Sequence, residues 1–379
     1  MRVLLVSHYY PPHVGGIENV VRMEAVHLAA RGADVTVLTS GARSAVSQED
    51  GVRVVRVAAW NGAERAGVPF PVLAPRLLTA ALRWARRADV VHVHDCLYLT
   101  SWAAGLAGML TRTPHLVTQH VALVEHPSAL VRGVQRAVYA VAGRGLLRRA
   151  RTVITLNASV ADFVLRHGAP PARTRHLANG VDTALFRPPA SVEERALARE
   201  RFGLPDNRPL VLFVGRLVPK KGYDLLLSGH DPSAGYDLVF AGDGDSAVLA
   251  GPPGVHHLGG LPPRELAEAY RACDVFALPS TAEGFPLTVQ EAMASGLPVV
   301  TTDDPGYAPY RLDRSRVTLL DRDAEEIRSA LSALAGDKQR RERMGLYSRE
   351  LATTAFAWEE HVSALSECYR EAVGATTYG

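Results

Sequence analysis

Short apolar runs recur along the chain, and longer amphipathic stretches separate them. Runs that are apolar throughout are typical of strands buried on both faces of a parallel sheet. In the first half of the chain these predicted strands are Val3–Val6, Val35–Leu38, Val52–Val57, Val90–His94, Leu116–Thr118 and Val153–Leu156. The pattern then restarts, with predicted strands at Leu210–Val214, Leu238–Ala241, Val275–Leu278 and Pro298–Thr301.

The stretches between these strands have the features of helices. Glu18–Arg31 ends at Gly32, and Arg76–Arg87 leads directly into a predicted strand. Alternating strands and helices predict the α/β class, and 379 residues are too many for one ordinary core. We therefore expect two doubly wound domains in tandem, joined in the turn-rich region near Asn179–Pro189.

Composition excludes several classes of protein. Hydrophobic residues make up 47% and charged residues 21% of the chain, which excludes disorder as the dominant state. The 3 cysteines (Cys96, Cys273 and Cys368) contain no CxxC spacing, so neither a disulfide framework nor a cysteine-built zinc site is expected. The apolar start at Val3–Val6 is too short for a signal peptide, and no run could span a membrane. We expect a soluble, cytoplasmic protein.

The charge is divided unevenly between the two halves. Residues 1–175 carry 21 arginines, no lysine and 10 acidic residues, a balance of +11, whereas residues 176–379 have a balance of −8. A basic first half could attract anionic ligands or an anionic membrane surface. A well-solvated surface without a partner explains the same balance equally well.

Phosphate-binding features follow the predicted strands, where parallel sheets place their ligands. Gly15 and Gly16 come after the first strand and before a helix, so their backbone N–H groups could approach a phosphate, although a plain tight turn fits as well. The segment is not GxGxxG, so a nicotinamide site is not predicted. After Leu210–Val214 come Gly215, Arg216 and, a few residues on, Lys221. A guanidinium fork and a mobile ammonium suit a diphosphate, and the alternative is a solvated turn.

The segment after Val275–Leu278 is the most informative. A loop with Glu283 and Gly284 precedes a short predicted helix that has Pro286 near its first turn, and the backbone N–H groups of residues 285–288 would face an anion there. Glu291 lies one turn into that helix. Two carboxylates beside a phosphate site are favourable when they accept hydroxyl hydrogen bonds, so the ligand should carry both phosphates and hydroxyl groups.

This segment resembles the Glu-x7-Glu motif of retaining GT-B glycosyltransferases of family four. The resemblance extends over nearly the whole chain and includes Gly15–Glu18, Asn179–Asp182, Gly215 to Gly222, Ala241–Gly244, Ala272–Phe276 and the region of Trp358. It implies the GT-B fold, two Rossmann-like doubly wound domains facing a central cleft. The implied boundaries are an acceptor-binding domain at 1–178, a nucleotide-sugar-binding domain at 179–357, and a helical segment at 358–379 that returns to the first domain.

The resemblance also implies roles for single residues. His120, Arg216, Lys221 and Glu283 are the expected catalytic group, with His120 near the reacting sugar. From the residues alone, His120 is more simply a hydrogen-bonded residue at a strand end. The expected donor-binding residues are Gly15, Gly16, Gly215, Leu258, Gly259, Gly284, Phe285, Pro286, Leu287, Thr288 and Glu291.

The acceptor is expected on the first domain, near Tyr9, His13, Asp95 and Glu125. The segment Leu130–Arg149 has the pattern of a basic amphipathic helix. It could cover the sheet, which is the simplest interpretation, dock on anionic lipid at the inner membrane face, or steer a phosphorylated acceptor.

The expected reaction is transfer of a hexose-type sugar, with its anomeric configuration retained, from a nucleoside diphosphate sugar. UDP-sugar is favoured over GDP-sugar, and the acceptor is a small molecule, a glycan or a lipid-linked molecule that could be anionic. We expect no cofactor, no nucleic acid partner and no metal, since Asp243-Gly244-Asp245 is interpreted as a turn. The segment Thr302–Tyr307 departs from the paired glycines common in the family. The alternatives are a non-catalytic or an epimerase-type nucleotide-sugar-binding protein.

Overall fold

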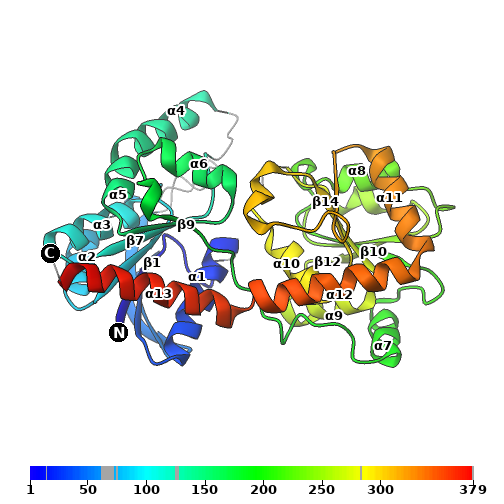
Figure 1. Cartoon of the computed structure of the whole chain (residues 1–379), viewed down its shortest axis with the longest axis horizontal. Coiled ribbons are helices and arrows are strands. Elements are labelled where there is room, and N and C mark those ends of the chain that lie inside the picture. Colours follow the sequence, from blue (N-terminus) through cyan, green and yellow to red (C-terminus); the bar gives the residue numbers. More distant parts are fainter. Residues whose placement is uncertain (14, 61–71, 74–75, 124–127, 282–283, 378–379) are drawn as a thin grey trace. The chain divides into compact units, whose positions relative to one another are not determined.

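The computed structural model describes residues 1–13, 15–60, 72–73, 76–123, 128–281 and 284–377. The chain forms two compact units (Figure 1): unit 1 comprises Met1–Asn179 with Glu359–Gly379, and unit 2 comprises Gly180–Trp358. Each unit contains one largely parallel sheet with helices on both faces. This architecture confirms the predicted α/β class.

The sheet of unit 1 has the strand order β3-β4-β2-β1-β6-β7-β8-β9, and β5 pairs with β4. Its strands are β1 (Arg2–Val6), β2 (Asp34–Gly41), β3 (Ala45–Glu49), β4 (Val52–Trp60), β5 (Val72–Leu73), β6 (Val90–His94), β7 (His115–Gln119), β8 (Thr152–Thr155) and β9 (Thr174–His176). Pairing is parallel except where β3 and β5 join β4. The central strands are buried along their length, as their continuous apolar sequences predict.

The helices of unit 1 pack on this sheet and bury its apolar side chains. They are α1 (Gly16–Ala30), α2 (Arg76–Ala85), α3 (Leu99–Thr111), α4 (Ala129–Val138), α5 (Arg144–Arg149), α6 (Ala158–Arg166) and α13 (Trp358–Thr377). The C-terminal helix α13 lies along unit 1 (Figure 1). Side chains fix it there: Arg31 donates to the carbonyl oxygen of Glu359, and His92 contacts the Tyr369 hydroxyl at 2.8 Å. The last helix of the chain is therefore part of the first unit.

The sheet of unit 2 is parallel throughout, in the order β12-β11-β10-β13-β14-β15. Its strands are β10 (Leu210–Val214), β11 (Asp237–Ala241), β12 (Val255–Gly259), β13 (Val275–Leu278), β14 (Val299–Thr302) and β15 (Thr318–Leu320). Its helices are α7 (Val192–Phe202), α8 (Tyr223–Gly229), α9 (Pro263–Ala272), α10 (Leu287–Ala294), α11 (Ala324–Gly336) and α12 (Lys338–Ala355). The strand order reverses direction at β10 and β13, so the loops after these strands diverge and leave room for a ligand.

Two packing details lie where the chain passes between units. The N–H of Val181 donates to the carbonyl oxygen of Phe356 at 2.7 Å. A side chain at Gly180 would bring its Cβ within 2.3 Å of the Trp358 ring, so only glycine fits there. The outgoing and returning segments of unit 2 are thus packed directly against each other.

The structure differs from the sequence-based prediction mainly at the sheet edges. The strands β3, β5, β9, β12 and β15 were not predicted. All are short, and the residues of β3, β9, β12 and β15 are half-exposed or exposed. The predicted single helix at Leu130–Arg149 is divided, with a π-helical turn at Tyr139–Gly143 between α4 and α5.

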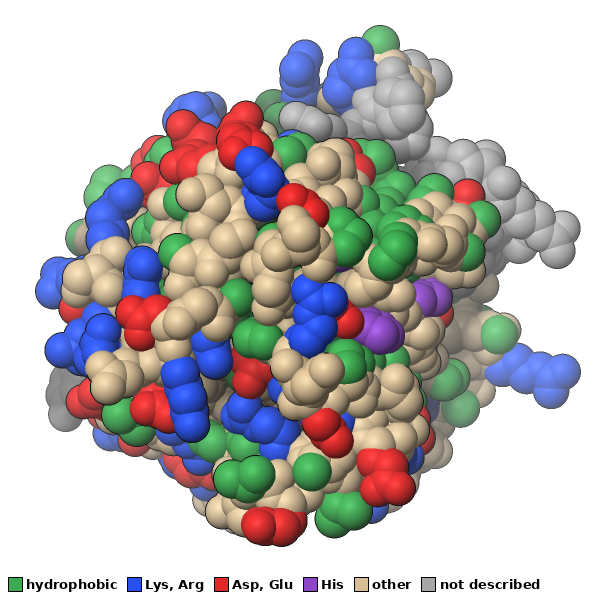
Figure 2. Space-filling view, turned by 90° about the vertical axis from the view of Figure 1, so that its right-hand side faces the viewer, with side chains coloured by type: hydrophobic (Ala, Val, Ile, Leu, Met, Phe, Trp, Pro, Cys, Tyr) green, Lys and Arg blue, Asp and Glu red, His purple; other side chains and the backbone are tan. Residues whose placement is uncertain are grey.

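The surface charges of unit 2 are mixed. Figure 2 looks onto the unit 2 end of the molecule and shows Lys and Arg side chains interspersed with Asp and Glu. The negative balance of the second half therefore does not gather into one acidic patch on this face. Within the described ranges, every helix is too short or too polar to cross a membrane.

Candidate functional site

The loops that follow the central strands of unit 2 are joined to one another through their backbones. The N–H of Gly215, after β10, donates to Ala241 O at 3.0 Å, and the N–H of Gly242, after β11, donates to Gly259 O at 2.8 Å. The backbone of the predicted Leu258 and Gly259 segment is thus brought beside Gly242, which in turn adjoins Gly215. The carboxyl ends of β10, β11 and β12 form one continuous main-chain surface.

Two glycines make this close approach possible. A Cβ on Gly242 would lie 2.0 Å from the carbonyl oxygen of Gly215, and a Cβ on Gly222 would lie 2.2 Å from that of Pro279. Gly222 also has a φ of +78°, which favours glycine. The second contact presses the loop after β10 against the loop after β13, so the two predicted phosphate-binding segments are neighbours.

The predicted cations lie on these neighbouring loops. Arg216 is exposed, and its side chain forms no ion pair within the described part of the chain. Lys221 ends a short helical turn, and the carbonyl oxygen of the preceding Lys220 accepts a hydrogen bond from the N–H of Thr281 at 2.9 Å. Lys221 is therefore held at the start of the loop that leads to α10. The predicted Glu283 lies outside the described residues.

One cation in this region was not predicted from the sequence. Arg322, between β15 and α11, donates to Pro279 O and to Pro219 O, both at 2.9 Å. It ties the Lys221 turn to the loop after β13. Nothing in the sequence around Arg322 distinguishes it from the other arginines, so only the fold reveals this contact.

The first turn of α10 presents free backbone donors. Pro286 is the N-cap and supplies no side-chain cap, so the N–H groups at the start of the helix have no partner inside it. The Phe285 ring is buried against Tyr310, with 4.1 Å between ring centroids, and this packing holds the first turn of α10 in place. The Thr288 hydroxyl is buried and has no hydrogen-bond partner among the described residues. Gly284, Leu287 and Thr288 thus surround a helix start that suits an anion.

Glu291 lies one turn further along the same helix. The hydroxyl of Tyr270, a fully buried side chain that was not predicted, donates to Glu291 Oε2 at 3.0 Å. Burial raises the pKa of Glu291 to about 7, and the hydrogen bond from Tyr270 opposes this rise. Hydroxyl groups can donate to the oxygens of a carboxyl group, so Glu291 is suited to a ligand with vicinal hydroxyl groups.

In unit 1, Gly15 and Gly16 come after β1 and play different parts. A Cβ on Gly15 would lie 2.1 Å from the Glu18 carboxylate, so a larger residue there would displace the Glu18 side chain. A Cβ on Gly16 would meet no described atom within 4 Å. No described neighbour explains the glycine at position 16, which starts α1.

The predicted Tyr9 and His13 lie beside this glycine pair. Their rings stack with centroids 4.2 Å apart, and His13 Nδ1 lies 3.0 Å from Glu18 Oε1. Glu18, which was not predicted as a site residue, thus links His13 to the glycine turn. Glu125, the remaining predicted acceptor residue, lies outside the described residues.

Asp95 and His120 are adjacent because β6 and β7 are paired in parallel. The backbone N–H of His120 donates to Asp95 Oδ1 at 3.3 Å, and Gln119 Nε2 donates to the same oxygen at 2.5 Å. Asp95 has a φ of +63°, and its buried Oδ2 has no partner among the described residues. Burial raises the pKa of Asp95 to about 7, and the nearby charge of Glu18 contributes. Backbone strain together with an unsatisfied carboxyl oxygen is typical of a functional site.

The ring of His120 is buried and neutral. Burial, followed by the neighbouring His94, lowers the pKa of His120 to about 3. His120 Nε2 lies 3.0 Å from His94 Nδ1. His120 is therefore a hydrogen-bonded residue at a strand end through its Nε2, as the alternative interpretation expects. Its Nδ1 has no hydrogen-bond partner in the described ranges.

Among the described residues, one group could ligate a metal. Glu24, His92 and His94 place one ligand atom each within 4.8 Å of the others, and all three are buried. However, His92 Nδ1 lies 2.8 Å from the Tyr369 hydroxyl, so a metal would have to displace that hydrogen bond. The Asp243-Gly244-Asp245 segment forms the predicted turn, in which Asp245 caps the short helix at Ser246–Leu249.

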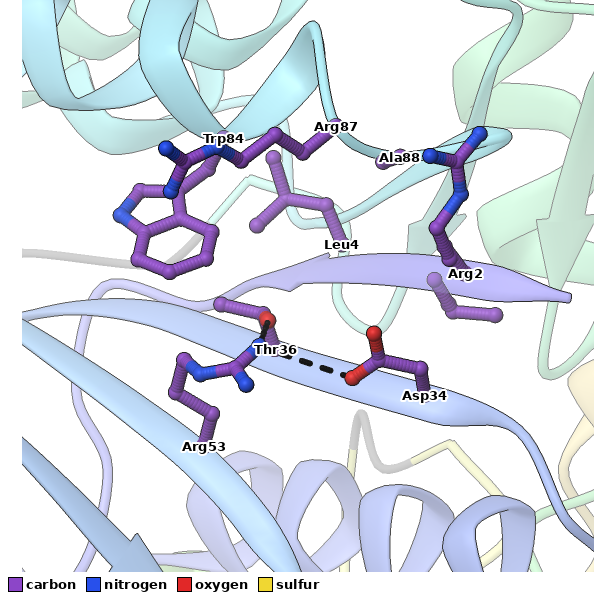
Figure 3. Close-up of a pocket in the computed structure, with 9 residues that line it drawn as sticks. Arg2, Leu4, Asp34, Thr36, Arg53, Trp84, Arg87 and Ala88 are labelled. Carbon is purple, nitrogen blue, oxygen red and sulfur yellow. Dashed lines mark hydrogen bonds and ion pairs between the residues drawn. The ribbon is translucent and has the colours of Figure 1, made fainter.

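A separate pocket of about 430 Å³ lies at the amino ends of the unit 1 strands, opposite the residues above (Figure 3). The Arg53 and Arg87 guanidinium carbons lie 5.3 and 5.2 Å from the centroid of the Trp84 ring. Arg53 is also paired with Asp34 at 3.5 Å. The pocket contains none of the predicted site residues, and solvent reaches its charged side chains.

Comparison with known families covers both units. Residues 15–180 match the family described as "Glycosyl transferase 4-like domain", and residues 194–351 match "Glycosyl transferases group 1". The chain is 30% identical to D-inositol 3-phosphate glycosyltransferase of Mycobacterium tuberculosis, over 95% of this chain and 79% of the relative.

Solved structures share the fold over nearly the whole chain. Sucrose-phosphate synthase from Thermosynechococcus elongatus superposes with a TM-score of 0.75, at 22% identity and with 99% of each chain covered. Anabaena HepE in complex with UDP-glucose superposes with a TM-score of 0.72, at 19% identity and with 97% of this chain and 98% of that chain covered.

Proposed function

This chain belongs to the group 1 glycosyltransferases of family four, which have the GT-B fold, and on that premise we propose that it transfers a hexose from UDP-hexose to a polyol hydroxyl with retention of anomeric configuration. One observation carries the proposal: the Lys221 turn is packed against the loop that leads to the uncapped start of α10. A diphosphate between these two elements would meet side-chain cations and backbone N–H groups together.

The donor half of the site is proposed on unit 2. Arg216 and Lys221 bind the diphosphate oxygens, the backbone at Leu258 and Gly259 meets the base, and Glu291 bonds the ribose hydroxyls. Glu283, although outside the described residues, is proposed to contact the sugar hydroxyls. We favour uracil over guanine because the structural neighbour HepE has been captured with UDP-glucose.

The chemical step breaks the bond between the anomeric carbon and the diphosphate oxygen. Negative charge builds on that oxygen as positive charge builds on the sugar ring, so the nearby cations and helix start stabilise the transition state. The acceptor hydroxyl attacks from the face that the diphosphate leaves, and its proton passes to the departing phosphate. Removal of one such stabilising group costs about 10²–10³ in rate in comparable sites.

The acceptor half is proposed on unit 1, at Tyr9, His13, Asp95 and His120. Two observations support a polyol that carries a negative charge. The relative from Mycobacterium tuberculosis is named for an inositol phosphate, and residues 1–175 carry a balance of +11. The unsatisfied carboxyl oxygen of Asp95 and the unpartnered Nδ1 of His120 are suited to hydroxyl groups.

We also propose that the reaction needs no metal, because the side-chain cations and the helix start supply the charge that a divalent ion would provide. Turnover should therefore persist after the protein is dialysed against a chelator. Loss of turnover in the chelator, with recovery on addition of Mg²⁺ or Mn²⁺, would refute metal independence.

A substrate panel tests the proposed function. The purified chain is incubated with UDP- and GDP-hexoses and with inositol, inositol phosphates and simple glycans, and the product's anomeric configuration is determined by proton NMR. We expect transfer from UDP-hexose and an α-linked product from an α-linked donor. A β-linked product would exclude retention, and turnover with GDP-hexoses only would exclude the proposed base.

A further inference from the structure

A chain of buried side chains lies behind His120 and joins segments far apart in the sequence. We name it the buried relay, and its members are Glu24 of α1, His94 of β6, His120 after β7 and His361 of α13. Each is at most 5% exposed. His94 Nδ1 lies 3.0 Å from His120 Nε2, His94 Nε2 lies 3.3 Å from Glu24 Oε2, and Glu24 Oε1 lies 3.0 Å from His361 Nε2.

His361, at the end of the buried relay that is farther from His120, determines which oxygen of the Glu24 carboxyl group can only accept a hydrogen bond. His361 Nδ1 lies 2.7 Å from the carbonyl oxygen of Ala178, which only accepts, so Nδ1 carries a hydrogen. One further proton is then shared between His361 Nε2 and Glu24 Oε1, either on the imidazole or on the carboxyl group. In both arrangements Glu24 Oε2 carries no hydrogen and can only accept.

The carboxyl oxygen Oε2 of Glu24 determines which ring nitrogen of His94 carries the hydrogen. Glu24 Oε2 and His94 Nε2 lie 3.3 Å apart in a charge-paired contact that does not meet hydrogen-bond geometry, and neither atom has a hydrogen-bond partner among the described residues. A carboxyl oxygen this close to Nε2 favours a hydrogen on that nitrogen over a bare lone pair. The hydrogen of His94 is therefore on Nε2. A neutral imidazole carries one ring hydrogen, so with Nε2 as the donor the other ring nitrogen is an acceptor. His94 Nδ1 is consequently a bare acceptor, and its partner atom His120 Nε2 must donate.

We propose that Glu24 acts through His94 to hold the hydrogen of His120 on Nε2, so that His120 Nδ1 is an acceptor for a substrate hydroxyl. Glu24, His94 and His361 are in this sense positioning residues for His120. The inference rests on the proposed function, in which His120 contacts a substrate. It also assigns a task to α13, because His361 holds the carboxyl group of Glu24 in the required orientation.

The neighbouring His92 provides an internal comparison. It is fully buried on the same strand as His94, but its ring contacts the hydroxyls of Tyr369 and Thr118, at 2.8 and 2.7 Å, and is 3.9 Å from Glu24 Oε2. The His92 ring lies directly against the relay, with its centroid 4.3 Å from that of His94. The Tyr369 hydroxyl contacts His92 and, among the described residues, forms no hydrogen bond with a member of the relay. Tyr369→Phe therefore disturbs the same core without removing a contact of the relay.

Two substitutions at Glu24 separate charge from hydrogen-bond direction. In Glu24→Gln the amide N–H can donate to neutral His361 Nε2, while the amide oxygen accepts from His94 Nε2, so the His120 tautomer is kept. In Glu24→Leu the acceptor is lost, and His94 can instead donate from Nδ1 to His120. We expect kcat of Glu24→Leu to fall at least about 10-fold, with donor KM changed little, and Glu24→Gln to recover most of kcat.

The controls separate this effect from simple destabilisation. Tyr369→Phe, compared at matched loss of thermal stability, should keep kcat near that of the wild type. Equal losses of kcat in Glu24→Leu and Tyr369→Phe would overturn the proposal, as would full activity of Glu24→Leu when His120→Gln is inactive. Full activity of His120→Gln itself would instead overturn the proposed role of His120.

A spectroscopic measurement tests the tautomer without any assay of activity. In protein labelled with ¹⁵N-histidine, the ring nitrogens of His120 are assigned by their loss in His120→Gln. We expect a protonated Nε2 and an unprotonated Nδ1, and the reverse in Glu24→Leu. A protonated Nδ1 in the wild type, or a stoichiometric metal ion bound to the purified protein, would overturn the relay.

Discussion

The strand-end loops of unit 2 and of unit 1 supply chemistry in different ways. In unit 2 the proposed functional groups are backbone N–H groups and side-chain cations such as Arg216, which come from short continuous segments. In unit 1 they are buried titratable side chains, among them Asp95 and His120, which parallel pairing of β6 and β7 brings together. A preformed anion site can thus be encoded within a short continuous segment. A site that depends on shifted pKa values requires side chains from segments that are distant in the sequence.

The largest expected effect tests the unit 2 half. Lys221→Ala should lower kcat/KM for the nucleotide sugar by about 10²–10³, because it removes a charge from the site where the leaving oxygen becomes negative. The adjacent Lys220→Ala is the matched control, since Lys220 is equally part of the turn but its side chain is exposed. Steady-state kinetics of both variants would settle the matter, and equal rates for the two would remove Lys221 from the mechanism.

The pH dependence of stability compares the two units directly. Asp95 and Glu291 both have a pKa raised to about 7 by burial, from ordinary values of 3.8 and 4.5. Between those limits the folded protein binds a proton that the unfolded chain has lost, so the free energy of unfolding falls as pH rises. Each group contributes a decrease of at most about 1.4 kcal/mol per pH unit.

Asp95→Asn and Glu291→Gln should each make this pH dependence shallower. Urea unfolding at pH 5, 6 and 7 provides the measurement. The decrease should begin at lower pH for the contribution of Asp95, whose ordinary pKa is lower. If both variants kept the slope of the wild type, burial would not tune these carboxyl groups as described.

The two glycines at the start of α1 sharpen the comparison within unit 1. Gly15→Ala should lose at most about 1 kcal/mol of stability, because its Cβ would lie 2.1 Å from the Glu18 carboxylate, whose flexible side chain must then change its rotamer. Gly16→Ala, with no described atom near its Cβ, should melt at the wild-type temperature or above it and bind the substrates more weakly. Thermal unfolding and substrate KM values measure both effects, and a destabilised Gly16→Ala would contradict the open space at that position.

The smallest expected effect concerns Arg322, which links the Pro219 and Pro279 loops. Arg322→Met removes both hydrogen bonds and should raise the donor KM about fivefold, equivalent to about 1 kcal/mol. Arg328→Met is the control, because Arg328 forms only ion pairs at the surface of α11. Identical donor KM values in the two variants would mean that the loops keep their positions without Arg322.

The sequence predicts the central strands well and makes the unit 2 segments conspicuous as candidates, for a physical reason. Buried parallel strands such as Leu210–Val214 are continuous apolar runs, and the Lys221 and α10 segments combine turn, charge and helix start within a few residues. The predictions fail for edge strands such as Ala45–Glu49, whose half-exposed residues lack that pattern. Arg322, Tyr270 and the partners of His120 act through contacts between distant segments, which no local pattern reveals.

Glu24 and His361 illustrate this limit most clearly. Each appears in the sequence as one polar residue on an amphipathic helix, where a solvated position is the ordinary expectation. Only the packing of α1 and α13 onto the same sheet buries both and places their side chains 3.0 Å apart. A buried acid paired with a buried histidine is therefore a property of the fold and cannot be predicted from either helix alone.

The central claim is that Arg216 and Lys221 hold a diphosphate. Titration calorimetry with UDP measures it most directly, with uridine as the ligand that lacks the diphosphate. We expect the double substitution Arg216→Ala and Lys221→Ala to weaken UDP binding about 100-fold and to leave uridine binding unchanged. We expect Lys220→Ala to bind UDP as the wild type does. Equal affinity of the wild type and the double variant for UDP would contradict the central claim.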